Sequence, residues 1–154
     1  MRITDLLDKR SIQLAAAPTD KEHALKQAVA LMEASGKLSD VAAYQKQVFA
    51  REEESTTGIG EGIAIPHGKC DAVKKPGLAA MVIPNGVDFD SLDGEPVTLL
   101  FLIAAPNTKD NVHLDVLSKL SVMLMDENFT TSLRNAKSVE EFLQIIDAAD
   151  ESAK

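Results

Sequence analysis

The chain has little of several residue types that would mark a special class of protein. Tryptophan is absent and aromatic residues make up 4% of the 154 residues, so we expect an aliphatic core. One cysteine, Cys70, excludes an internal disulfide and is typical of a reducing compartment such as the cytoplasm. The 16 Lys and Arg residues stand against 24 Asp and Glu, and this net charge of −8 argues against nucleic acid as a partner.

Long hydrophobic segments are also missing. The longest apolar run, residues 97–105, is well short of the roughly 20 residues that a membrane helix needs. The first residues lack the apolar segment of a secretory signal. We therefore expect a cytoplasmic protein with no direct membrane insertion. A hydrophobic content of 45% over this length is typical of one domain that buries its own core.

Apolar patterns predict an α/β fold. The run at 97–105 is nearly continuous, which indicates a strand buried on both faces and therefore helices on both sides of a sheet. Shorter apolar runs predict further strands at residues 12–14, 63–65, 78–83 and 87–89. A Pro-Asn-Gly sequence at 84–86 predicts a turn.

Capping residues predict where the first two helices begin. Thr19 and Glu22 have the spacing of a capping box ahead of an apolar helical stripe. Ser39 or Asp40 begins a second helix, which ends around residues 51–54.

The second half of the chain predicts three more helices. Thr108 or Asp110 caps a helix that carries His113 in its first turn, on the side of its apolar stripe. A short helix follows at residues 128–134, and the last begins at the capping box of residues 138–141. The final residues are polar from Asp147 onward, which is typical of a tail.

The chain is organised around residues 58–68, Gly-Ile-Gly-Glu-Gly-Ile-Ala-Ile-Pro-His-Gly. Three alternating glycines precede a short strand that Pro66 ends, so His67 is expected at a strand end, where α/β sheets place their chemistry. The stretch is not a dinucleotide fingerprint, because Ile63 stands where the last glycine is needed, and it lacks the Gly-Lys-Ser/Thr of a phosphate loop. On these residues alone, a turn that only serves topology and an ordinary loop histidine remain open.

A longer stretch carries a family resemblance. Residues 51–68, REEESTTGIGEGIAIPHG, resemble the active-site signature of enzyme IIA of the fructose/mannitol class. These are phosphocarrier domains of the bacterial phosphoenolpyruvate-dependent sugar phosphotransferase system. Residues 107–114, NTKDNVHL, resemble the second histidine segment of that family, and the similarity extends from about residue 3 to residue 146. It implies a single domain, residues 1–148, with a mixed sheet of about five strands, and residues 149–154 as a polar tail or the start of a linker.

The resemblance also implies a mechanism. His67 would accept a phosphoryl group from the carrier protein HPr and pass it to a cysteine of a IIB domain, which serves the membrane component IIC. Arg51 would face the phosphohistidine, and His113 would be the partner of His67. The domain would be a protein-histidine phosphotransferase component that needs no cofactor and no metal.

Four further residues are candidates for binding the phosphoryl oxygens: Thr57, Gly58, Gly60 and Glu61. Backbone N–H groups of a glycine-rich segment can cradle an anion. Glu61 either binds an imidazole N–H or faces solvent.

Two interpretations compete with these roles. Without the resemblance, Arg51 is an ordinary cation at a helix end and His113 a core histidine. A metal site at His67, Cys70 and His113 lacks any recognised ligand spacing.

We expect His67 to be neutral at pH 7, since Arg51 and partial burial both disfavour the imidazolium.

The alternative function is regulatory. Nitrogen-type relatives of the family keep the histidine site but bind other proteins according to their phosphorylation state. The loop at residues 104–113 is more similar to the fructose subgroup. The sequence does not name the sugar, since the membrane component selects it.

Overall fold

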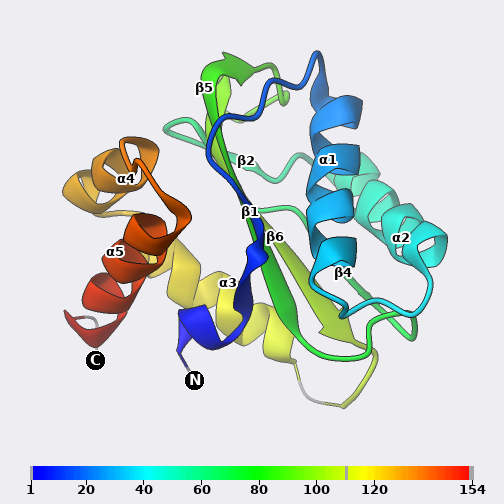
Figure 1. Ribbon diagram of the computed structural model, residues 1–154. Coiled ribbons are helices and arrows are strands. Elements are labelled where there is room, and N and C mark those ends of the chain that lie inside the picture. The colour runs from blue at the N-terminus through cyan, green and yellow to red at the C-terminus, as the bar shows by residue number, and fades with distance from the viewer. Residues whose placement is uncertain (1, 110, 153–154) are drawn as a thin grey trace.

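The protein is an α/β sandwich with one mixed sheet between two layers of helices (Figure 1). A computed structural model describes residues 2–109 and 111–152. The sheet has six strands in the order β1-β5-β6-β3-β2, and β4 also pairs with β6. This confirms the predicted fold class, with one strand more than the approximate five expected. Within the described residues, none of the helices is long and apolar enough to cross a membrane.

The elements in chain order are the 3₁₀ helix η1 (Ile3–Asp5), β1 (Leu7–Gln13), α1 (Lys21–Ala34), α2 (Val41–Glu54), β2 (Gly58–Gly60), β3 (Ile63–Ala64), β4 (His67–Cys70), β5 (Gly77–Val87), β6 (Val97–Pro106), α3 (Val112–Met123), α4 (Glu127–Arg134) and α5 (Val139–Ser152). β6 is parallel to β3 and β4 and antiparallel to β5. β1 is parallel to β5, and β2 is antiparallel to β3.

β6 is the centre of the core. Its residues from Leu99 to Ala105 are each at most 1% exposed. Because side chains alternate across a strand, Leu100 and Leu102 pack with α1 and α2, while Phe101 and Ile103 pack with α3, α4 and α5. Figure 1 shows these two helical layers on opposite sides of the sheet. The continuous apolar run thus has the double burial that the sequence predicts.

The helix starts differ in detail from the sequence predictions. α1 is capped by Asp20, whose carboxylate accepts the N–H of His23 at 2.8 Å, and not by Thr19. A carboxylate at the N-cap also complements the positive end of the helix dipole, which the threonine hydroxyl does not. α2 begins after Asp40, one of the two caps expected, and its carboxylate accepts the N–H of Ala43 at 3.1 Å.

Two other predicted boundaries were wrong. β5 continues through the turn expected at residues 84–86, because a bulge accommodates them: its register with β6 shifts between Val82 and Val87. α3 has Asn111 as its N-cap residue and not Thr108. Asp110, the other cap expected, lies outside the described residues.

The polar tail expected at the C-terminus is largely helical. α5 continues to Ser152, and residues 153–154 lie outside the described residues. Asp150 is 1% exposed; its carboxylate accepts the N–H of Ile3 at 2.8 Å and pairs with Lys119 of α3 at 2.6 Å. These contacts bury the carboxylate of Asp150 near the end of the last helix, which composition alone does not indicate.

We predict that Asp150→Asn destabilises the protein by about 2–3 kcal/mol, near the low end for a broken buried ion pair because Lys119 is partly exposed. Urea unfolding at pH 7 measures the loss. Glu151→Gln is the control, since the pair of Glu151 with Arg2 is exposed.

The Asp150 effect should depend on pH. Burial by itself raises the pKa of Asp150, but the hydrogen bonds from Lys119 and Ile3 outweigh it and lower the pKa. As pH falls, the Asp150 carboxylate is therefore protonated in the unfolded chain at a higher pH than in the folded protein. Its contribution to the free energy of unfolding is complete above about pH 4 and is lost as pH falls through the pKa of the folded state. A difference between wild type and Asp150→Asn that stays constant down to pH 3 would contradict this assignment.

Candidate functional site

The site begins with the close packing of α2 on β4. A Cβ added to Gly68 would lie 3.0 Å from the Tyr44 ring and 3.1 Å from Val48, both on α2, so only glycine lets the helix approach this closely. The Tyr44 hydroxyl donates to the Ile103 carbonyl at 2.7 Å and fixes the helix against β6. Because side chains alternate on β4, His67 lies on the face opposite to the one that α2 covers.

One hollow of about 380 Å³ collects the predicted reactive residues. Arg51 comes from the end of α2, His67 from the start of β4 and His113 from the first turn of α3. The full lining is Gln47, Ala50, Arg51, Glu54, His67, Gly68, Lys69 and His113. The structure therefore brings together three side chains that lie up to 62 positions apart in the sequence (113 − 51).

His67 has a defined tautomer. Its Nδ1 lies 3.1 Å from the carbonyl oxygen of Ile65, and because a carbonyl can only accept, Nδ1 carries the proton. In the neutral ring Nε2 then holds the lone pair and is the nucleophilic position. Burial, and after it the Arg51 guanidinium, lower the pKa of His67 against the raising effect of the Ile65 carbonyl.

His113 faces His67 across the hollow. Their ring centroids are 6.2 Å apart with 34° between the ring planes. Nδ1 of His113 is buried and makes no hydrogen bond to the part of the chain that the structure describes. Since an orphaned N–H is rarer than an orphaned acceptor, we assign the proton of the neutral ring to Nε2. Burial and the nearby Lys69 ammonium lower the pKa of His113.

Arg51 supplies a permanent positive charge to the hollow. Its Nη1 donates to the carbonyl of Ser55 at 2.9 Å, just beyond the end of α2, which holds the side chain at the helix terminus. A guanidinium carries five N–H donors in a rigid fork, so donors remain for an anion in the hollow.

Gly60 and Glu61 lie elsewhere. Glu61 and Gly62 have φ of 59° and 74° and form the tight turn between β2 and β3, which requires positive φ at both positions. Gly60 and Glu61 line a different hollow, against α3 and α4. Ile63 and His67 are four residues apart on extended chain, or about 13 Å, so the turn at Glu61 and Gly62 lies away from the histidine.

Three of the four residues expected to cradle phosphate donate their backbone N–H groups to side chains of the protein. Both the N–H and the hydroxyl of Thr57 donate to Glu52, at 2.7 and 2.6 Å. The N–H of Gly58 donates to Thr56 at 3.0 Å, and the N–H of Glu61 to Asp93 at 3.0 Å. An anion could use these three N–H groups only by displacing those partners, so binding of phosphate by this segment stays a prediction.

Sequence reasoning missed Lys69, which lines the hollow beside His67. The pleat was the available signal, since residues two apart on a strand share a face. Gln47 and Glu54 were also missed, although their spacings of four and three from Arg51 place them on the same side of α2. Cys70 lies on the opposite face of β4 to His67, and among the residues described no group of three His, Cys, Asp or Glu side chains is placed to hold a metal ion.

Comparison with known proteins identifies the family. A family profile described as "Phosphoenolpyruvate-dependent sugar phosphotransferase system, EIIA 2" matches residues 5–149. The chain belongs to this family.

Relatives with fructose-specific names are among the similar proteins. This chain is 43% identical over 150 residues, 97% of its length, to the "PTS system fructose-specific EIIABC component" of Bacillus subtilis, but it spans only 24% of that protein. It is 41% identical over 127 residues to the "PTS system fructose-specific EIIA component" of Haloferax volcanii, covering 82% of each chain.

Solved structures share the fold. The nitrogen regulatory protein IIA-Ntr of Neisseria meningitidis superposes with a TM-score of 0.86 at 34% identity, covering 94% of this chain and 98% of that one. IIAMTL of Escherichia coli, in its complex with phosphorylated enzyme IIBMTL, gives a TM-score of 0.80 at 28% identity, covering 93% and 99%.

We predict that His67 titrates below the ordinary histidine pKa of about 6.5 and is mostly neutral at pH 7. Arg51→Gln should move the midpoint part of the way upward, because burial remains the larger cause. NMR titration of the ring C–H signals measures both midpoints. A His67 midpoint above 6.5 in the wild type would show that burial and Arg51 do not control this ring.

Proposed function

We propose that this domain is a phosphocarrier that accepts a phosphoryl group on His67 and transfers it onward during sugar uptake of the fructose type. The proposal rests on one observation: His67, with its lone pair on Nε2, lines the same hollow as Arg51, Lys69 and His113. Family membership supports the phosphotransfer role, and the names of the two relatives support the fructose type.

The chemistry follows from the geometry. The Nε2 lone pair attacks phosphorus while the bond to the donor breaks, and the donor keeps the electron pair. Charge on the three equatorial oxygens is stabilised by the Arg51 fork, the Lys69 ammonium and the Nε2–H of His113. Positive charge that builds on the His67 ring strengthens its Nδ1–H bond to the Ile65 carbonyl. A cysteine thiolate of the acceptor then attacks phosphorus and His67 recovers its lone pair.

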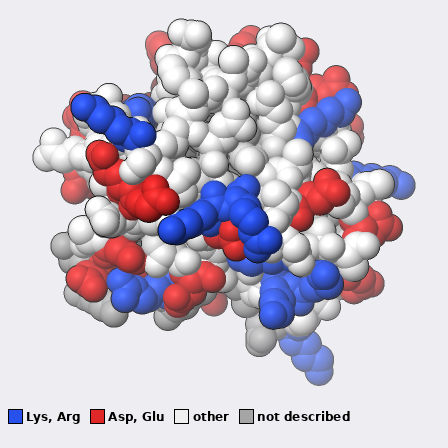
Figure 2. Space-filling view, in the orientation of Figure 1, with Lys and Arg blue, Asp and Glu red and all other residues white. Residues whose placement is uncertain are grey.

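Two protein partners are needed, one before and one after His67. We assign the donor as the phosphohistidine of HPr and the acceptor as a IIB domain, with the membrane component IIC served indirectly. The complex of the Escherichia coli homologue with phosphorylated IIB supports the second partner. Figure 2 shows basic and acidic side chains side by side on the face seen in Figure 1, so on this face the net negative charge does not form one acidic patch. Recognition would then depend on the rim of the hollow more than on long-range attraction.

A regulatory role is the second candidate. The observation that favours it is the similarity to the Neisseria nitrogen regulatory protein, which covers nearly the whole of both chains. A regulator with the same hollow would accept the phosphoryl group equally well, so acceptance alone does not separate the two roles.

We predict that the wild type gains one phosphoryl group when it is mixed with phosphoenolpyruvate, enzyme I and HPr, and that His67→Ala gains none. Arg51→Ala and His113→Ala should still be modified, but about a hundredfold more slowly, as expected for removal of one positioned donor. Intact-mass spectrometry over time measures the rates.

His23→Ala is the matched control, because this third histidine lies on α1, bound to Thr19 and Gln27 and outside the hollow. Modification of His67→Ala at the wild-type rate would eliminate His67 as the acceptor. No mass gain in the wild type with active carriers would reject the mechanism for these partners.

We predict that the phosphorylated domain loses its phosphoryl group to the cysteine of a purified fructose-type IIB domain, and that a Cys→Ser variant of that IIB domain receives none. Mass spectrometry of both proteins measures the transfer. Stable phosphorylation in the presence of active IIB domains would instead favour the regulatory role.

A further inference from the structure

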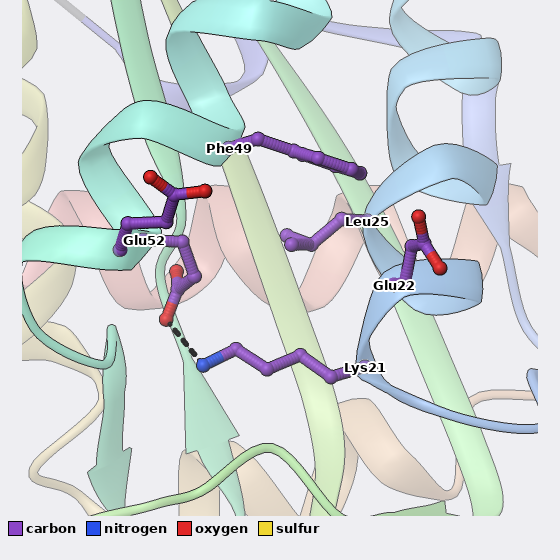
Figure 3. Close-up of a pocket in the computed structure, with 6 residues that line it drawn as sticks. Lys21, Glu22, Leu25, Phe49 and Glu52 are labelled. Atoms are coloured by element: carbon purple, nitrogen blue, oxygen red, sulfur yellow. Dashed lines mark ion pairs between the residues drawn. The ribbon is translucent and has the colours of Figure 1, made fainter.

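A buried carboxylate, Glu52, lies one residue beyond Arg51 and has no part in the mechanism above. Its side chain is 5% exposed and forms an ion pair with Lys21 of α1 at 2.9 Å. Figure 3 shows Lys21 reaching across from α1 to Glu52 on α2, with Leu25 and Phe49 beside them. The Lys21 ammonium also lies 4.8 Å from the centre of the Phe89 ring. A buried carboxylate loses its solvation by water, and the Lys21 ammonium offsets part of that loss. The burial of a charge at this position indicates a structural role for Glu52.

The Glu52 carboxylate holds one residue with both of its oxygens. Oε2 accepts the backbone N–H of Thr57 at 2.7 Å, and Oε1 accepts the Thr57 hydroxyl at 2.6 Å. Hydrogen bonds to an ionised acceptor are stronger than neutral ones, and two of them fix both the position and the orientation of the residue. The chain between the end of α2 and β2 is thereby anchored at Thr57.

Thr57 in turn holds the residue that orients His67. The Thr57 carbonyl accepts the N–H of Ile65 at 3.0 Å, and the Ile65 carbonyl accepts Nδ1–H of His67 at 3.1 Å. Three consecutive contacts therefore lead from the buried Glu52 to the proton that leaves Nε2 of His67 as the nucleophile. Each link is a direct hydrogen bond; the two from Thr57 to Glu52 are buried, and the one at His67 is partly buried.

We propose that Glu52 is a positioning residue for His67: through Thr57 and Ile65 it holds the carbonyl that keeps the proton on Nδ1 and the lone pair on Nε2. Its effect on phosphoryl transfer rests on the proposed function, whereas its effect on the tautomer does not. A tilt of the Ile65 carbonyl would weaken the Nδ1–H bond and let the proton move to Nε2, which removes the nucleophile.

The charged groups around His67 act on its pKa in opposite directions. Glu52 and Glu54 of α2 favour positive charge on the ring, and Arg51 disfavours it. Lys69 of β4 and His113 of α3 complete the surroundings. Glu54 is exposed at the hollow, so Glu52 is the acid of this pair that is bonded into the scaffold.

The test compares Glu52→Ala, Glu52→Gln and Glu53→Ala in the whole chain with ¹⁵N-labelled histidine. NMR shows which ring nitrogen of His67 carries the proton, and intact mass gives the rate of phosphoryl acceptance. Glu52→Ala should populate the Nε2–H tautomer and slow acceptance about tenfold or more, as removal of residues that orient a functional histidine does. Glu52→Gln keeps a carbonyl oxygen for the Thr57 N–H and should retain the Nδ1–H tautomer.

Glu53→Ala is the matched control. This neighbouring glutamate lines the same outer hollow, between α1 and α2, as Glu52, but it is exposed. A Glu52→Ala protein with the tautomer and rate of Glu53→Ala would overturn the proposal. If Glu52→Ala does not fold, Glu52→Met, which removes both contacts with Thr57 but keeps a side chain of similar size, decides instead: a mixed His67 tautomer supports the proposal and a wild-type tautomer overturns it. If the wild type accepts no phosphoryl group, the proposed function fails, while the tautomer comparison still decides the role of Glu52.

Discussion

The double burial of β6 is the constraint on which the rest of the structure depends. A strand that is apolar on both faces can be satisfied only by helices on both sides of the sheet, so the chain must build two separate layers. These layers can meet only where the sheet ends. β4 is a short strand beside β6, and the hollow at its start is lined by α2 from one layer and by His113 of α3 from the other. A side chain at the start of β4 is therefore reached from both layers, and His67 is that side chain.

The same electrostatic surroundings have two consequences at His67. In the proposed mechanism, Arg51 and Lys69 attract an anion to the hollow, while burial together with Arg51 lowers the pKa of His67 and keeps the imidazole in the neutral form that can attack phosphorus. A ring in water at the same pH would be partly protonated and a weaker nucleophile. The fixed Nδ1–H bond adds direction, because it determines which nitrogen is reactive. In this mechanism, Arg51 thus serves both to bind an anion and to keep the nucleophile in its reactive form.

The sequence predicted the parts of this arrangement that depend on local pattern or on family resemblance. The two-sided burial of β6 follows from its composition, and Arg51, His67 and His113 were named from the motifs that resemble the family. What failed was tertiary in origin. Gly58 and Gly60 were expected to bind phosphate, but they lie on β2, one arm of a hairpin whose turn is formed by Glu61 and Gly62 with positive φ. Polar residues near the C-terminus were expected to form a tail, but Asp150 has buried partners on η1 and α3, 31 or more positions away (150 − 119).

The three consecutive glutamates at 52–54 show why composition cannot assign these roles. Successive residues of an α-helix point about 100° apart, so three identical side chains at the end of α2 face three environments. Glu52 turns inward to Lys21 and Thr57, Glu53 faces the outer hollow between α1 and α2, and Glu54 faces the hollow of His67. Of the three, only Glu52 is buried, so its hydrogen bonds with Thr57 are protected from competition by water. A shift of one residue in the start of α2 would exchange these roles, which makes the Asp40 cap, far from any reactive atom, part of what defines the site.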